Sequence, residues 1–396
     1  MTRHDQVLDA LVVGAGPAGS ATAARLAGQG FSVALWDRAE FPRAKPCAEY
    51  LSPGSVAALG RLGALPEVLR EGPARLAGMR VVGPDGAAFT GRFRAGIGLG
   101  LPRERLDYQL AQFAQRRGAT LCQGVVLDRF WTEGDTVTVL GHQDGRPVTV
   151  AARLLIGADG LNSRVARQLG LSRRPRLRRV ALVAHATGIL GMMDTGEMHV
   201  TEGAYVGLAP LGGGVTNVAL VVDLARGKIQ PPLADTFKRW LASFPSLHGR
   251  AEALELASPV RGVGPFGRST RRATADRTLL VGDAADFYDP FTGEGVYAAL
   301  RGAELAADCS ATALRTDRRS AAHLAPYDRA RRSTFAAKWA LERIVSWVIA
   351  RPRVLGHVAR RLSREADLAH QLVNVTAHVA PAATVFRPSY VWRLAH

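Results

Sequence analysis

The stretch VLDALVVGAGPAGS, residues 7–20, decides the fold of this 396-residue chain. Residues 7–13 form a short apolar run that predicts a buried β-strand, and residues 20–29 predict a helix built from small side chains. A second apolar run, residues 31–36, predicts another strand, which ends at Asp37. The order strand, glycine-rich turn, helix, strand is that of a βαβ unit with a parallel sheet.

The three glycines of the turn have different physical roles. Gly14 permits the tight turn, Gly16 lets the backbone approach a pyrophosphate, and Gly19 lets the helix pack closely on the strand. The free N–H groups and the dipole at the helix N-terminus favour an anion at this point. Asp37, which lies 18 positions beyond Gly19, is expected to accept hydrogen bonds from an adenosine ribose. The whole pattern favours a dinucleotide site over a simple structural turn.

Two later segments repeat the order strand, carboxylate, helix. Residues 154–165 contain Asp159 after an apolar run, and residues 278–296 contain Asp283 after another. Because ligands of doubly wound sheets bind at the carboxyl ends of the strands, we expect both carboxylates to face one crevice with Asp37 and the glycine-rich turn. The alternative for Asp159 is a helix N-cap.

The rest of the chain predicts a second, β-rich layer and a helical end. A hairpin is expected at residues 79–90, and strand-like runs with turns fill residues 120–150. Further strands are predicted at 178–188, 196–209 and 214–223, with helices near 103–117 and 231–243 and a helical pattern over 296–371. We therefore expect an α/β fold with a doubly wound sheet, an inserted mixed or antiparallel sheet, and C-terminal helices.

Composition limits the class of protein. With 47% hydrophobic and 21% charged residues, the chain has the profile of a folded globular protein. Its three cysteines, Cys47, Cys122 and Cys309, are too few for a disulfide framework or a zinc cluster and favour a reduced compartment. Residues 1–6 are polar and no apolar run reaches transmembrane length, so neither a signal peptide nor a membrane span is expected, and the predicted location is cytoplasmic.

The formal net charge of +17 comes from 51 Lys and Arg against 34 Asp and Glu. A positive field favours acidic surfaces, anionic lipid and phosphorylated cofactors. Nucleic acid is not expected as a partner, because the sequence contains no recognised nucleic-acid-binding module.

Taken together, these motifs resemble the FAD-dependent oxidoreductases of the glutathione-reductase-like Rossmann fold, a superfamily that includes aromatic hydroxylases, geranylgeranyl reductases and flavin halogenases. The resemblance covers residues 7 to about 305 and rests on the glycine-rich turn, on Gly157-Ala158-Asp159-Gly160 and on Gly282-Asp283. Arg103 to Asp107 matches the family's Arg-x-x-Leu/Phe-Asp signature, although an ordinary arginine at a helix start would look the same. The FAD-binding residues that the resemblance implies are Gly14, Gly16, Gly19, Asp37, Arg38, Arg103, Asp159, Gly282, Asp283, Pro290, Gly293 and Gly295.

The resemblance also implies a domain plan. An FAD-binding domain is expected from residues 1–75, 100–170 and 270–310, and a substrate domain from 76–99 and 171–269. Residues 311–396 are expected to form a helical region.

Finer features resemble geranylgeranyl reductase-like flavoproteins. Residues 41–54 are similar to their Pro-Arg-x-Lys-x-Cys-Gly segment, and residues 289–300 are similar to their second glycine-containing segment. The resemblance implies that Cys47, Gly293 and Gly295 act in catalysis, the two glycines by directing N–H groups at the N1/O2 edge of reduced flavin. The Trp-x-Trp-x-Ile-Pro segment of flavin halogenases is missing, which disfavours halogenation.

Two departures keep the reaction open. Ala48 replaces the glycine after Cys47, and residues 205–210 read Tyr-Val-Gly-Leu-Ala-Pro where those reductases have Tyr-x-Trp-x-Phe-Pro. Cys47 is therefore either a group that acts near the substrate or a small apolar filler.

Three functions follow as hypotheses. The first is reduction of a C=C bond in a lipophilic, isoprenoid- or polyketide-like molecule, favoured by the segments around Cys47 and Gly293. The second is an FAD monooxygenase, favoured by the missing aromatic strand. In either enzyme the expected reductant is NADPH or NADH, docking transiently because a second nucleotide fingerprint is missing, with a ferredoxin-type donor as the alternative. The third is a non-catalytic flavin- or partner-binding protein at a membrane surface.

The membrane hypothesis rests on the C-terminal helices. Residues 315–364 contain thirteen Lys and Arg against three Asp and Glu, and within them residues 339–349 carry Trp, Ile and Val side chains. Such a helix either lies peripherally on a membrane or packs its apolar stripe on the protein's own core with a solvated basic face.

Overall fold

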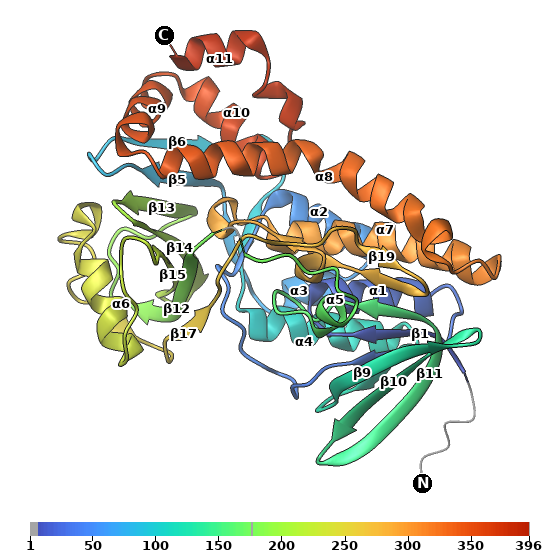
Figure 1. Cartoon of the computed structure of the whole chain (residues 1–396). Coiled ribbons are helices and arrows are strands. Elements are labelled where there is room, and N and C mark those ends of the chain that lie inside the picture. The colour runs from blue at the N-terminus through green and yellow to red at the C-terminus, as the bar shows by residue number, and fades with distance from the viewer. Residues whose placement is uncertain (1–6, 176, 396) are drawn as a thin grey trace.

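The computed structural model describes residues 7–175 and 177–395 and is built around two large sheets (Figure 1). The expectations for residues 1–6 lie outside the described residues. The first sheet has the parallel order β20-β11-β1-β2-β8, with β19 antiparallel at one edge and the β9–β10 ribbon paired to β11. Its strands are β1 (Leu8–Val13), β2 (Val33–Trp36), β8 (Thr120–Cys122), β9 (Val126–Glu133), β10 (Thr136–Gln143), β11 (Arg146–Gly157), β19 (Thr274–Ala275) and β20 (Thr278–Leu280).

The register of this sheet brings four chain segments to one edge. Val13 at the end of β1 pairs with Trp36 of β2 and Gly157 of β11, and Gly157 pairs in turn with Leu280 of β20. Every residue that follows these strand ends therefore emerges at the same carboxyl edge, where doubly wound sheets bind ligands.

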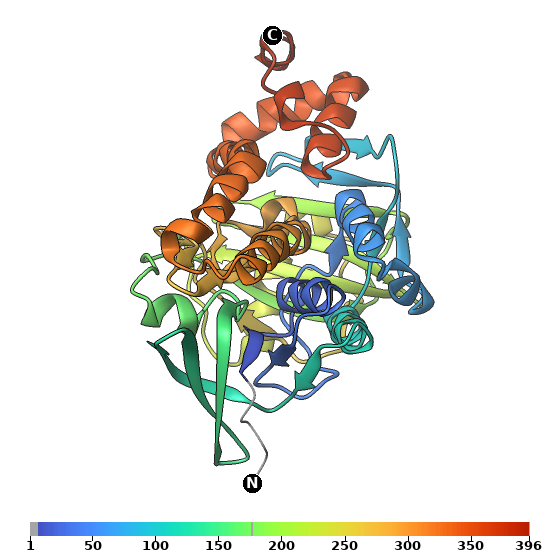
Figure 2. The same cartoon turned by 90° about the vertical axis from the view of Figure 1, so that its right-hand side faces the viewer.

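Helices cover the sheet because their small side chains permit close approach. The helix α1 (Pro17–Ala27) is buried over most of its length and packs between α4 (Arg103–Arg116) and α7 (Gly295–Arg315), which Figure 2 shows nearly end-on. It begins at Pro17, three residues before the predicted start, because proline is well suited to the first turn of a helix. The smaller helices of this region are α2 (Pro53–Leu62), α3 (Leu65–Arg70) and α5 (Arg164–Gln168).

The second sheet has the order β16-β12-β15-β14-β13-β5-β6, with β17 paired to β12. All its pairs are antiparallel except β13 with β5. Its strands are β5 (Gly78–Val82), β6 (Ala88–Arg92), β12 (Arg179–Thr187), β13 (Thr195–Thr201), β14 (Ala204–Gly212), β15 (Val215–Asp223), β16 (Glu255–Leu256) and β17 (Arg261–Val263). Two short sheets link the large ones: β3 (Tyr50–Leu51), β4 (Ala74–Leu76) and β7 (Gly98–Gly100), and β18 (Arg268–Ser269) with β21 (Asp286–Phe287).

The side-chain alternation gives the second sheet two apolar faces. Leu182, Leu220 and their neighbours pack against α6 (Leu233–Ala242) and the 3₁₀ turn η1 (Pro245–Leu247), while Val183 and Val221 face the opposite side. The prediction of one strand over residues 196–209 is wrong: the chain turns at Glu202-Gly203, where Gly203 has a φ of +78°, and makes the β13–β14 hairpin.

The helical end is as expected from the sequence and joins both sheets. It contains α8 (Ala321–Ile349), α9 (Pro352–Arg364), α10 (Ala366–Thr376), the turn η4 (Ala382–Thr384) and α11 (Pro388–Ala395). The helix α8 runs from β19 of the first sheet to the region of β6 and α9, as Figure 1 shows. Among the described residues, no helix combines the length and the apolar character needed to cross a membrane.

Candidate functional site

The glycine-rich turn is packed too tightly to hold side chains at two of its positions. A Cβ on Gly14, which has a φ of +103°, would lie 2.3 Å from the carbonyl oxygen of Ala158. A Cβ on Gly19 would lie 1.7 Å from the carbonyl oxygen of Gly14. These two glycines therefore let β1, α1 and the end of β11 meet at the carboxyl edge of the sheet. Gly282 makes the corresponding contact after β20, since its Cβ would lie 2.8 Å from that of Ala18.

Gly16 is different, because it faces open space. The nearest atoms to a Cβ at this position are guanidinium nitrogens of Arg103 and Arg43, at 3.8 and 3.9 Å. Two cations and the N-terminus of α1 thus surround a gap that a side chain would fill. This arrangement fits the pyrophosphate of FAD.

Carboxylates hold these two arginines in place. The guanidinium of Arg103 donates two hydrogen bonds of 2.7 Å to Asp107, one turn further along α4. Burial disfavours the charge on Arg103, but Asp107 and Cys47 outweigh it and raise the arginine's pKa. Arg43 pairs with Asp107 at 3.1 Å and with Asp37 at 3.4 Å.

Asp37 connects the end of β2 to the glycine-rich turn. It is buried, and its Oδ2 accepts a 2.8 Å hydrogen bond from the N–H of Ala15, which ties the end of β2 to the glycine-rich turn. Arg38, the next residue, is exposed and does not line the cavity described below.

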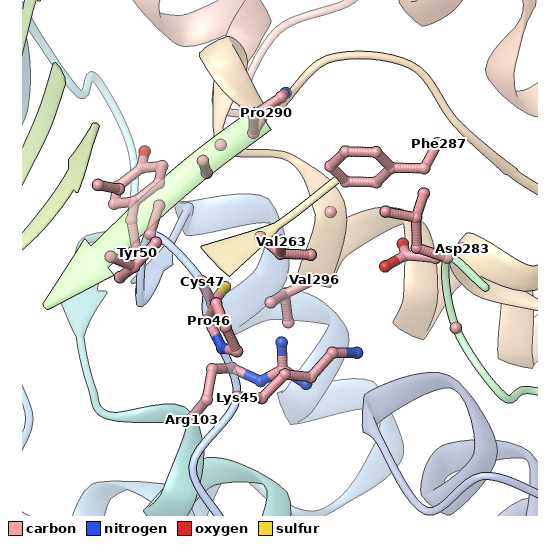
Figure 3. A pocket seen from close by; sticks show the side chains of 18 of the residues that line it. Lys45, Pro46, Cys47, Tyr50, Arg103, Val263, Asp283, Phe287, Pro290 and Val296 are labelled. Carbon is pink, nitrogen blue, oxygen red and sulfur yellow. The ribbon is translucent and has the colours of Figure 1, made fainter. Parts of the chain in front are cut away.

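The other two predicted carboxylates have separate environments. Asp159 accepts hydrogen bonds from the N–H groups of Arg164 and Val165 at 2.6 and 3.2 Å, so it caps the first turn of α5, although the N-cap residue itself is Ser163. Burial raises its pKa. Asp283 lies in the 3₁₀ turn η2 (Gly282–Ala284) and lines the cavity, as Figure 3 shows. The crevice thus contains Asp283, while Asp159 turns into the cap of α5.

A cavity of about 1190 Å³, open solvent at its mouth included, lies between the two sheets. At one end it is lined by charged groups, among them Lys45, Arg103 and Asp283. Figure 3 shows Lys45 and Arg103 below Cys47, and Asp283 across the cavity from it. The wall from the second sheet is apolar: Ala181, Val183, Met198, Gly207, Ala219 and Val221. The cavity therefore joins an anion-binding end to a hydrophobic end.

Cys47 lies on the cavity wall between these ends. Its carbonyl oxygen accepts a 3.1 Å hydrogen bond from Nδ2 of Asn217 on β15, which fixes the loop on the second sheet. The thiol is half-buried and within the reach of a molecule in the cavity.

The segment that follows η2 also lines the cavity, through Pro290, Gly293 and Gly295. Gly293 has a φ of +68°, and its N–H donates to the carbonyl of Pro290 at 3.0 Å, which closes the 3₁₀ turn η3 (Pro290–Thr292). The expectation that both glycines offer N–H groups is therefore corrected: that of Gly293 is already used inside the turn. Gly295 begins α7, and N–H groups in a first helical turn have no acceptor inside the helix.

Sequence reasoning missed four residues of this site. Arg43 and Lys45 stand in the quoted segment 41–54, whose Pro-Arg-x-Lys spacing was a signal for them. Lys45 is half-buried and lines the cavity, where desolvation and the nearby Arg103 lower its pKa. Tyr205 and Asp289 are distant in sequence, and their 2.6 Å hydrogen bond is formed only by the fold.

Asp289 is the centre of a buried polar group behind the cavity. Its Oδ1 accepts from the Tyr205 hydroxyl, and its Oδ2 pairs with Arg179 at 2.5 Å. Burial and the charge of Asp289 raise the pKa of Tyr205 well above its usual value, so this phenol stays neutral.

Among residues 7–175 and 177–395, no cluster of His, Cys, Asp and Glu could hold a metal ion.

Comparison with known proteins agrees with this geometry. A family model described as an FAD binding domain matches residues 7–341. The chain is 30% identical to a menaquinone reductase of Mycolicibacterium smegmatis, covering 98% of this chain and 95% of the relative. It is also 30% identical to digeranylgeranylglycerophospholipid reductase 1 of Methanothermobacter thermautotrophicus, covering 81% of each chain.

Solved structures show the same fold. A flavoprotein/dehydrogenase from Cytophaga hutchinsonii has a TM-score of 0.84 at 20% identity and covers 96% of this chain and 95% of its own. The flavin-dependent halogenase CmlS has a TM-score of 0.77 at 27% identity, covering 84% of this chain and 63% of its own. With the open position at Gly16 and its arginines, these matches establish an FAD-binding protein. The chain belongs to the FAD-binding family of flavoprotein oxidoreductases, and within it resembles the menaquinone and digeranylgeranylglycerophospholipid reductases.

Proposed function

We propose that this FAD-dependent oxidoreductase reduces a C=C bond in a lipophilic molecule of isoprenoid or polyketide type, with NADPH or NADH as electron donor. The observation that carries the proposal is the hydrophobic end of the cavity, whose wall on β12, β14 and β15 is apolar. Moving a hydrocarbon chain from water to such a wall lowers its free energy, because its apolar surface leaves water. A charged substrate would lose its hydration there at a cost in free energy. The names of the two reductases cited above specify a menaquinone and a digeranylgeranyl lipid, which supports the same substrate class.

Some residues of the site would bind FAD, and others would take part in the reaction. FAD, when bound, supplies the hydride chemistry of the reaction. Arg43 and Arg103 hold the pyrophosphate, and the N–H of Gly295 stabilises negative charge at the N-terminus of α7. Cys47 lies where its S–H can give a proton to the substrate carbon that does not receive the hydride. Overall, the double bond gains a hydride and a proton, and the nicotinamide donor is oxidised.

A nicotinamide donor is consistent with a single fingerprint. Residues 14–19 form the GxGxxG turn that follows a strand and opens a helix, which is the context that FAD binding requires. Residues 262–267 also read GxGxxG, but they connect β17 to β18 and open no helix. NADPH or NADH would thus dock transiently, without a Rossmann unit of its own. Oxidation of NADPH or NADH by the holoenzyme, followed by absorbance, tests this part; reduction only by a reduced ferredoxin would overturn it.

Product mass after anaerobic and aerobic turnover tests the reaction. The screen offers prenylated quinones, geranylgeranyl lipids and polyketide-type aromatics to the holoenzyme with NADPH. We expect products that gain two hydrogens, with or without oxygen. Products that gain one oxygen atom, with substrate-dependent oxygen consumption, would overturn the proposal in favour of a hydroxylase.

The variant Cys47→Ser tests the role of the thiol. If Cys47 delivers a proton, turnover falls at least tenfold while FAD content is unchanged, because a serine hydroxyl is a far weaker acid. The matched control is Cys309→Ser, a half-buried cysteine on α7 that does not line the cavity. Unchanged turnover with a lower melting temperature would show that Cys47 only fills space.

A further inference from the structure

We propose that the last turns of α8 and the start of α9 form a docking surface for an anionic lipid bilayer. This surface, which we name the α8 tip, consists of Arg343, Ile344, Trp347, Arg351 and Arg353. It goes beyond the redox function and does not depend on which reaction the flavin site performs.

Two large apolar side chains at the α8 tip are turned to solvent. Ile344 is 47% exposed and Trp347 is 51% exposed. They are three residues apart, so they lie on the same face of the helix. Tryptophan and isoleucine together on a helix face are typical of segments that lie in a membrane interface.

The charge around these two side chains is positive. The guanidinium of Arg351 lies 4.1 Å from the centroid of the Trp347 ring and donates to the Trp347 carbonyl at 2.9 Å. Arg343 and Arg353 are also exposed. Within the described part of the chain, no carboxylate forms an ion pair with any of these three arginines, whereas Arg361 further along α9 pairs with Glu365. Free cations beside an indole complement lipid phosphates and other anionic headgroups.

Other side chains of the same turns pack against the apolar cluster that also walls the cavity. Val345, Val348 and Ile349 belong to the apolar cluster that contains Met198 and Tyr205 of the cavity wall. Because a helix with its side chains is about 10–12 Å across, the α8 tip lies roughly one helix diameter from the cluster that walls the cavity. A bilayer on this surface would place a lipophilic substrate next to the protein's hydrophobic site.

Exposed apolar side chains continue at the chain's C-terminal end. Phe386, Val391 and Trp392 are exposed on and before α11, which packs against α9. Figure 2 shows this helical region projecting beyond the two sheets. The projection leaves the region accessible to a flat surface.

Sedimentation with lipid vesicles tests the proposal on the full-length holoenzyme. We expect the protein to pellet with phosphatidylcholine/phosphatidylglycerol vesicles, to pellet several-fold less with phosphatidylcholine alone, and to be released by high salt, which screens the arginines. Quenching of tryptophan fluorescence by brominated lipid reports contact directly.

Variants locate the contact. The double variant Ile344→Ser/Trp347→Ser should bind phosphatidylglycerol vesicles at least fivefold more weakly and lose most of the brominated-lipid quenching. The double variant Arg343→Glu/Arg353→Glu should lose the preference for anionic lipid. The matched control is Trp131→Ser on β9, since Trp131 is 40% exposed and also lies beside an arginine, Arg129, at 5.6 Å. FAD content shows that each variant is folded.

Three outcomes would overturn the proposal: vesicle binding that the Ile344/Trp347 variant retains, binding that Trp131→Ser abolishes equally, or no vesicle binding by the wild type. In the last case, a dimer that dissociates in the Ile344/Trp347 variant would assign the α8 tip to a second copy of the chain. Reduction of a detergent-dispersed substrate is expected to be equal in wild type and variant, so failure of docking is distinguishable from failure of the redox function.

Discussion

At the residue scale, we expect Gly16 to be required for FAD binding but not for folding. No protein atom lies within 3.8 Å of a Cβ at this position, so the apoprotein accommodates a side chain. Gly16→Val should therefore fold with an unchanged melting temperature of the apoprotein but retain no FAD, because the valine occupies the pyrophosphate position. Flavin absorbance after purification measures this. The control is Gly60→Val, an exposed position in α2 with similar free space; full FAD occupancy in Gly16→Val would remove the phosphate assignment.

Two neighbouring aspartates provide a second residue-scale prediction. Asp283 lines the cavity, whereas Asp286 pairs with Arg331 and accepts a 2.8 Å hydrogen bond from the Trp339 indole. Asp283→Ala should weaken FAD binding at least tenfold with little loss of stability. Asp286→Ala should instead lower the free energy of unfolding by roughly 3 kcal/mol, because the buried Arg331 loses its partner. Titration with FAD and urea unfolding measure the two effects, and equal FAD affinities would refute the distinction.

At the element scale, the first N–H of α7 is expected to act on the flavin. Gly295→Pro removes the first N–H of the helix, and should slow flavin reduction about tenfold with a smaller change in FAD affinity. Stopped-flow absorbance measures the reduction rate. Gly295→Ala keeps the N–H, and its Cβ would lie 3.7 Å from Phe287, so this control should react normally. Equal rates in both variants would show that this N–H does not act on the flavin.

A hydrogen-bonded pair, His185 of β12 with Glu49, connects β12 to the loop that carries Cys47, and its strength depends on pH. Nε2 of His185 lies 2.5 Å from Glu49, and the Glu49 hydrogen bond raises the pKa of the histidine despite partial burial; Glu104 acts in the same direction and Arg261 opposes it. Since the folded-state pKa exceeds the unfolded value of about 6.5, the stabilisation is complete below pH of about 6.5 and is lost as pH rises through the folded-state pKa. Melting temperatures of wild type and His185→Gln should therefore differ most at acidic pH and converge at alkaline pH. A difference that does not depend on pH would contradict this assignment.

At the scale of the whole molecule, the cavity between the sheets makes FAD a stabilising ligand. FAD at a hundredfold excess over its Kd should raise the free energy of unfolding by about 2.7 kcal/mol, because the cofactor binds only the folded chain. Calorimetry with and without added FAD measures the shift. Gly16→Val should show none of it, and a shift of the same size in that variant would place the stabilising site elsewhere.

What the sequence determined by itself was the first sheet, the dinucleotide turn and the superfamily. These depend on local patterns: an apolar run before Gly14, small side chains after it, and Asp37 at a set distance along the chain. Local periodicity predicts elements well, because a strand or a helix is a repeat of the same backbone geometry. It failed at residues 196–209, where a turn at Glu202-Gly203 divides the predicted strand into a hairpin.

Only the tertiary structure decided how the site is assembled. Arg43 meets Asp107, Cys47 meets Asn217, and Tyr205 meets Asp289, in each case across a long stretch of chain. The same holds for the capping role of Asp159 and for the used N–H of Gly293, which depend on where the backbone turns. It also holds for the α8 tip, since a sequence shows that a helix is basic and apolar but not which side chains remain exposed. Such contacts are set by the packing of the two sheets against each other, and pairing between distant residues leaves no periodic trace along the chain.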